Sequence, residues 1–171
     1  MNIKQIGNIM KKFLMTLAIM TLLGSAAMAQ DAWKLVESQR FRFIAYRINS
    51  SLSQTDPRFA TLNEAGYGLE VTKKWIQCKL PFVGKVYRSS LNEQHVEIFE
   101  GQYTYEYKKV KRRKATDMVV KMSARSSDGS DKFDMTFVID ENGNANLTVR
   151  SNFRETVTYY GKILPVGLPE K

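Results

Sequence analysis

Two side chains have the chemistry for nucleophilic catalysis, and each type occurs once: Cys78 and His95. A thiolate beside an imidazole base would suit acyl transfer. Cys78, however, alternates with Ile76 and Leu80 on the predicted buried face of a strand. Burial disfavours the thiolate and makes a cysteine inert. His95 opens a later strand, so we expect it at the surface or at a sheet edge.

Other patterns of catalysis and cofactor binding are missing from the sequence. One histidine and one cysteine do not make a typical zinc site. The sequence has no Gly-rich phosphate loop, no Gly-x-Ser-x-Gly elbow and no Ser-x-x-Lys motif at a helix start. The sequence therefore favours a non-enzymatic protein and predicts no cofactor and no metal.

A calcium loop is the next candidate, because Asp140, Asn142 and Asn144 place oxygen ligands at alternate positions. Such a loop continues with Gly and closes with a bidentate Glu. Ala145 and Ser151 occupy those two positions here. The same Asp and Asn residues are typical of a tight hairpin turn, which is the interpretation that we adopt.

A basic run holds six cations in seven residues. Its members are Lys108, Lys109, Lys111, Arg112, Arg113 and Lys114. Packed like charges repel one another unless an anion neutralises them. Outside the cytoplasm, the matching partners are anionic envelope lipids or glycans, and no nucleic acid is expected. The alternative is a solvated loop that joins two strands.

Just before this run, Tyr103, Tyr105 and Tyr107 alternate with polar residues. Exposed tyrosines in such a row could stack on sugar rings or on a partner's side chains. The same face is predicted to pair with apolar residues of the next strand, which favours packing at the edge of the core.

These residues must be positioned by strands, because the chain after residue 40 alternates apolar and polar residues with a period of two. The predicted strands are Phe41–Asn49, Tyr67–Val71, Trp75–Leu80, His95–Tyr107, Thr116–Arg125, Lys132–Asp140, Asn144–Arg150 and Thr156–Ile163, with a short one at Val83–Tyr87. Residues Gln30–Arg40 suit one short helix.

The register of the C-terminal hairpins follows from their turns. A two-residue loop at Asp128-Gly129 pairs apolar residues throughout: Ala124–Phe133, Met122–Met135, Val120–Phe137 and Met118–Ile139. A three-residue loop, Glu141-Asn142-Gly143 with Gly143 left-handed, gives the pairs Ile139–Ala145, Phe137–Leu147 and Met135–Val149. Both hairpins bury the same face of the middle strand, and a one-residue slip would expose it. A third hairpin pairs Val149–Val157 and Leu147–Tyr159.

Weaker pairings extend this sheet. Around a Lys73-Lys74 turn they are Val71–Ile76, Leu69–Cys78 and Tyr67–Leu80, and the tyrosine strand would add Tyr105–Met118 and Tyr103–Val120. The expected fold is therefore all-β, a single antiparallel meander of about eight or nine strands in a curved sheet or sandwich. A lipocalin-like barrel is the alternative. Its interior, lined by Met118, Val120, Met122, Met135 and Phe137, could carry a small apolar ligand or lipid.

The N-terminus has the pattern of a secretory signal peptide. Lys4, Lys11 and Lys12 precede an apolar run, Phe13–Leu23, which is too short to cross about 30 Å of hydrocarbon. Small residues follow, so we expect cleavage between Ala29 and Gln30. Met10 is an alternative start. Residues 30–171 would then form a single exported β domain of +6 net charge, against +9 for the whole chain.

Two short stretches resemble a known family. The first is Leu80-Pro81-Phe82-Val83-Gly84; the second comprises Gly143, Arg154, Tyr159 and Gly161. With the signal peptide, these residues resemble a family of small exported Bacteroidota proteins, domain of unknown function 4251, although Phe82 stands where the family often has Tyr. The resemblance covers almost all of residues 33–163 and implies an exported, one-domain protein without a known activity. The leading hypothesis is a periplasmic or secreted binding or accessory module.

Overall fold

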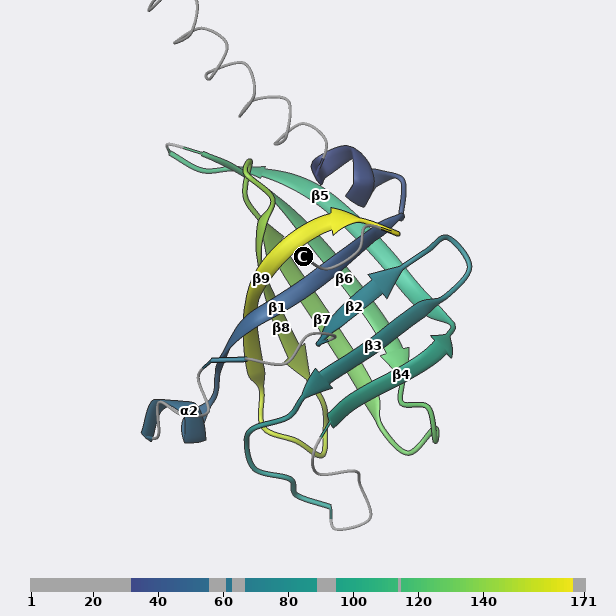
Figure 1. The fold of residues 1–171 in the computed structure, drawn as a ribbon, viewed down its shortest axis with the longest axis vertical. Helices are drawn as coiled ribbons and strands as arrows, with labels where there is room; N and C mark the ends of the chain where they lie inside the picture. Colours follow the sequence, from purple (N-terminus) through teal and green to yellow (C-terminus); the bar gives the residue numbers. More distant parts are fainter. Residues whose placement is uncertain (1–31, 56–60, 63–66, 89–94, 114, 168–171) are drawn as a thin grey trace, which may run out of the picture.

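Nine antiparallel strands follow one another along the chain (Figure 1). The computed structural model describes residues 32–55, 61–62, 67–88, 95–113 and 115–167. The strands are β1 (Phe41–Asn49), β2 (Gly68–Val71), β3 (Ile76–Pro81), β4 (His95–Gly101), β5 (Tyr103–Lys111), β6 (Thr116–Arg125), β7 (Lys132–Ile139), β8 (Asn144–Arg150) and β9 (Val157–Pro165). Residues 32–37 are helical, as predicted for the described part of Gln30–Arg40. A second short helix, α2, covers Ser51–Thr55.

The strands form one sheet in the order β4-β3-β2-β1-β9-β8-β7-β6-β5. The first strand pairs with the last, so consecutive strands β4 and β5 lie at the two edges. The sheet curls into a half-barrel (Figure 1), and its β4 side contacts β6. The Ser127 amide donates to the Glu97 carbonyl oxygen at 3.2 Å across this junction. The expected antiparallel meander is thus confirmed, in a strongly curled form.

The predicted registers of the C-terminal hairpins are confirmed. Every predicted pair between β6 and β7, between β7 and β8 and between β8 and β9 is present. Gly143 is left-handed, with φ of 78°. Leu69 pairs with Cys78 and Val71 with Ile76. The loop around Asp128-Gly129 is longer than the predicted two residues. The last backbone hydrogen bond of the hairpin runs from the Ser126 amide to the Asp131 carbonyl oxygen, so residues 127–130 form a four-residue loop.

The predicted single strand His95–Tyr107 is wrong, because the chain leaves one sheet edge and enters the other within it. β4 ends in a bulge, where the register against β3 shifts and Glu100 adopts a φ of 46°. β5 begins at Tyr103 and pairs only with β6 among the described strands. Glu100 and Gln102 lie at this corner and are the residue types that ordinary strand surfaces carry. The alternation of apolar and polar residues therefore gave no sign that β4 ends and β5 begins here.

The predicted register of the tyrosine strand is also wrong, by four residues. Tyr105 pairs with Met122 and Tyr103 with Ala124, because the strand continues to Lys111 instead of ending at Tyr107. An even shift keeps every side chain on its predicted face. Residues Val83–Tyr87 form no strand, and Val86 makes an isolated bridge to Arg154.

The inward face of the sheet is filled with apolar side chains. Phe41 and Phe43 meet the ring of Phe137 edge-on, at centroid distances of 6.0 and 5.2 Å. The residues named for a ligand-carrying interior are closed to solvent, from 0% exposed for Val120 to 3% for Met122. A side chain that lined a water-sized chamber would have accessible surface inside it. Within the described residues the interior is therefore a packed core. These side chains line no chamber that could hold the small apolar ligand of the carrier alternative.

Candidate functional site

The basic run lies at one end of the sheet, in the hairpin formed by β5 and β6. Its first residues, Lys108–Lys111, belong to strand β5, so the run is only partly the loop that was predicted. Figure 1 shows the tip of this hairpin reaching past the neighbouring strands. The cations among residues 108–113 are all exposed. Lys114 lies outside the described residues.

Two cations of the run are neutralised by the protein itself. Arg112 Nε lies 2.6 Å from Asp117 Oδ2, across the hairpin. Lys109 Nζ lies 2.8 Å from Glu37 Oε1 and 5.4 Å from the centre of the Trp33 ring. In the part of the chain that the structure describes, Lys108, Lys111 and Arg113 form no ion pair. Among the described cations of the run, these three are left for an external anion.

Two tyrosines of the row fasten other segments to β5: Tyr105 holds the helical segment 32–37, and Tyr103 holds the turn between β2 and β3. The Tyr105 hydroxyl donates to the Val36 carbonyl oxygen at 2.7 Å, and the Tyr103 hydroxyl donates to the Thr72 carbonyl oxygen. Burial, followed by the neighbouring tyrosines, raises the pKa of Tyr105. Both rings are half-buried, whereas Tyr107 is exposed. Core-edge packing therefore accounts for the first two tyrosines.

Cys78 lies in the core, as predicted, and is 1% exposed. Its Sγ is 3.8 Å from the Val96 carbonyl oxygen. Burial and, to a smaller extent, the charge of Glu97 raise the pKa of the thiol. His95 lies at the start of edge strand β4, where its ring approaches the ring of Tyr67 at 6.2 Å.

Native Cys78 should therefore react with iodoacetamide at mildly alkaline pH far more slowly than the urea-unfolded protein does. Each unit by which the pKa rises lowers the thiolate fraction about tenfold, so we expect a rate difference well beyond that factor. Mass spectrometry of the alkylated chain measures it. The variant His95→Ala should leave the native rate unchanged. Equal rates in folded and unfolded protein would show that the thiol is accessible.

The Asp140 turn satisfies its own carboxylate. One oxygen accepts the amides of Asn142 and Asn144 at 2.8 and 2.9 Å, and the other accepts the Asn144 side chain at 2.8 Å. This is the hydrogen bonding of a hairpin turn. Among the described residues, no group of three or more His, Cys, Asp or Glu side chains is placed to hold a metal ion.

A cleft that the sequence did not reveal lies at the other end of β6, where β4 meets the β6–β7 loop. Its volume is about 200 Å³. Its lining is polar apart from one ring and comprises His95, Glu97, Ser126, Ser127, Asp128, Ser130, Phe133 and Arg154. These residues come from three stretches of the chain, residues 95–97, residues 126–133 and Arg154, so no motif spacing could have joined them.

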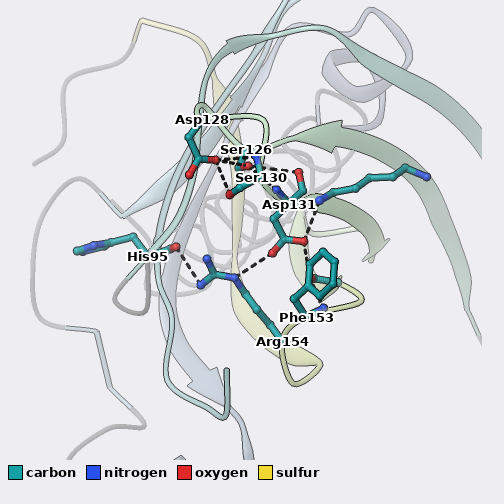
Figure 2. Close-up of polar contacts among 9 residues, drawn as sticks. His95, Ser126, Asp128, Ser130, Asp131, Phe153 and Arg154 are labelled. Carbon is teal, nitrogen blue, oxygen red and sulfur yellow. Dashed lines mark hydrogen bonds and ion pairs between the residues drawn. The ribbon is translucent and has the colours of Figure 1, made fainter. Parts of the chain in front are cut away.

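Arg154 is fixed at the base of this cleft by a buried ion pair (Figure 2). Its Nε lies 3.0 Å from Asp131 Oδ2, and the two side chains are only 4% and 1% exposed. Nη1 donates to the His95 carbonyl oxygen at 3.3 Å. The guanidinium also lies 5.2 Å from the Phe82 ring centre and 5.7 Å from that of Phe133. Arg154 therefore joins β4 to the β7 and β9 side of the sheet.

Asp131 is held as firmly as its partner. Its Oδ1 accepts the Ser151 hydroxyl at 2.6 Å and the Lys132 amide at 2.8 Å. A buried carboxylate needs both a counter-ion and hydrogen bonds to offset its desolvation, and Asp131 has both. The only sequence signal for this network was Arg154 itself, which was part of the family resemblance.

Asp128 lines the cleft at an exposed position. Its Oδ1 accepts the Ser126 and Ser130 hydroxyls, both at 2.7 Å, and the Ser130 amide at 3.0 Å. The hydrogen bond from Ser126, then those from Ser130, lower the pKa of Asp128 to about 2. Both serine side chains are thereby oriented by one carboxylate.

The fold and cleft define an all-β, half-barrel protein with a polar pocket at the sheet junction. The chain belongs to the family described as domain of unknown function (DUF4251), whose model matches residues 25–163. A comparison with curated proteins finds no match. Within the described residues, no helix has the length and apolar character needed to span a membrane.

Proposed function

We propose that the protein is an exported, non-enzymatic binding module whose β5–β6 hairpin docks on an anionic component of the cell envelope. Export is supported by the signal-peptide pattern of residues 1–29, which lie outside the described part of the structure. The observation that carries the docking is the set of exposed cations, Lys108, Lys111 and Arg113, on a hairpin that projects from the sheet. Each lacks an ion-pair partner among the described residues.

Electrostatics support this hairpin as the docking element. Cations that are already paired inside the protein gain little from an external anion, which sets Lys109 and Arg112 apart from the other three. Successive side chains of a strand point to opposite faces. Lys108 and Lys111 are three residues apart on β5, so they present charge on opposite faces of the hairpin. A flat anionic surface that receives the tip can therefore reach both.

Replacing Lys108, Lys111 and Arg113 with serine should weaken binding to vesicles containing phosphatidylglycerol by about 100-fold, because each basic residue near an anionic surface contributes about 1 kcal/mol. Vesicle sedimentation at low ionic strength measures the binding. A second arm uses immobilised polygalacturonate, so that a preference for lipid or for acidic glycan becomes visible.

The matched control is Lys73, Lys74 and Lys79 to serine, which removes the same charge from exposed positions on β3 and its preceding turn. This variant should bind within a few-fold of the wild type. Equal losses in the two variants would mean that only net charge matters. Unchanged binding by the hairpin variant in both arms would remove the hairpin from the function.

A further inference from the structure

The cleft at the β4 junction is a second place where the protein can bind a ligand. It is distinct from the basic hairpin, because the two lie at opposite ends of β6. The cleft combines a rigid guanidinium, two carboxylates and three serines. Its volume of about 200 Å³ suits a ligand of about one ring.

Arg154 offers hydrogen-bond donors here without offering net charge. Its hydrogen bonds use Nε and Nη1, and Nη2 has no partner among the described residues. Asp131, 3.0 Å away, neutralises the guanidinium. The ion pair and the two flanking rings keep the side chain in place, so a ligand does not have to order it on binding.

The other charges of the cleft are negative. Glu97 and Asp128 line it, and neither forms an ion pair among the described residues. Lys79, the cross-strand neighbour of Glu97, is exposed and makes no ion pair with it in the described structure. An anionic ligand would therefore meet two carboxylates and a guanidinium that is already neutralised. A simple cation would leave the Arg154 donors unused.

From this balance we propose that the cleft binds a neutral, hydroxyl-rich ligand, namely one residue of a saccharide. Hydroxyl groups accept from a guanidinium and donate to carboxylates at the same time, which matches donors and acceptors set side by side. Charge-assisted hydrogen bonds of this kind are about twice as strong as neutral ones. The Ser126 and Ser130 hydroxyls both donate to Asp128 (Figure 2). Ser126 Oγ already accepts the Asp131 amide at 2.9 Å, whereas Ser130 Oγ accepts from no donor among the described residues and is available to a ligand hydroxyl.

Saturation-transfer NMR tests this proposal on the protein without its predicted signal peptide, residues 1–29. The probes are the methyl glycosides of glucose, galactose and N-acetylglucosamine. At least one should receive saturation. Ser127→Phe should abolish that transfer, because Ser127 is exposed, lines the cleft and would fill it with a ring. Glu97→Gln, at another exposed position, should weaken binding several-fold. Asn146→Phe, on the outer face of β8, is the control and should bind like the wild type.

Three outcomes overturn the proposal: no transfer to any glycoside, transfer that survives Ser127→Phe, or binding of methylammonium in place of the sugars. Urea unfolding confirms that each variant is folded before it is scored. Ser127→Phe should also bind anionic vesicles normally, so failure of the saccharide site and failure of the hairpin are separate results.

Discussion

Asp131→Ala should lower the free energy of unfolding by about 3–5 kcal/mol, the usual cost of removing one partner from a buried ion pair. The Arg154 side chain is only 4% exposed, and the variant leaves this buried guanidinium without a counter-ion. It also removes the acceptor of the Ser151 hydroxyl. Urea denaturation followed by tryptophan fluorescence measures the change as a shift of the midpoint at constant slope.

The matched control for this experiment lies three residues away. Asp134 forms an ion pair with Lys132 at 3.3 Å, but both side chains are more than half exposed. Asp134→Ala should therefore cost less than about 1 kcal/mol. The double variant Asp131→Leu/Arg154→Met should recover part of the lost stability, since no charge is left buried. Similar losses for Asp131→Ala and Asp134→Ala would contradict the role assigned to the buried pair.

Gly161→Ala should cost about 3 kcal/mol or more, because there is no room for a methyl group where β9 pairs with β1. A Cβ at this position would overlap the Ile44 carbonyl oxygen and lie 2.6 Å from Cζ of Phe43. Neither neighbour can retreat: the oxygen belongs to the backbone, and the Phe43 ring is fully buried against Phe137. Thermal and urea unfolding should both show the loss.

Gly129→Ala separates this steric effect from backbone strain. Gly129 has a φ of 70°, but a Cβ there would meet nothing within 4 Å. Its substitution should cost only about 1 kcal/mol, the penalty for a left-handed non-glycine residue. If the two glycine variants were equally stable, close approach at Gly161 would not be the reason for a glycine there.

The C-terminal hairpins could be predicted because independent constraints agreed on them. The Asp128-Gly129 and Asn142-Gly143 turns each fixed a register, and both registers buried Phe133 and Phe137 together. The tyrosine strand lacked such a second constraint. Its lysines looked like a loop, yet the strand can include them because it lies at a sheet edge, where charged side chains remain in water.

The cleft could not be predicted for a different reason. Asp131 and Arg154 lie 23 residues apart and meet only after β7, β8 and β9 have paired. Asp131 looked like one more polar residue after a turn. In the folded protein Asp131 is buried beside Arg154 and acts as its counter-ion. Whether a polar residue is buried depends on tertiary packing, which the period-two pattern of a sequence does not report. The sequence thus predicted the sheet well and this site poorly.

The pairing of β1 with β9 has a consequence for the order of folding. The ladder from Phe41–Pro165 to Asn49–Thr158 joins segments more than a hundred positions apart. Such distant contacts must be formed against a large loss of chain entropy, and they make folding slow. A nascent chain can form its local hairpins early, but β1 can pair with β9 only after β9 has been synthesised. Until then, β1 has one flank open to aggregation.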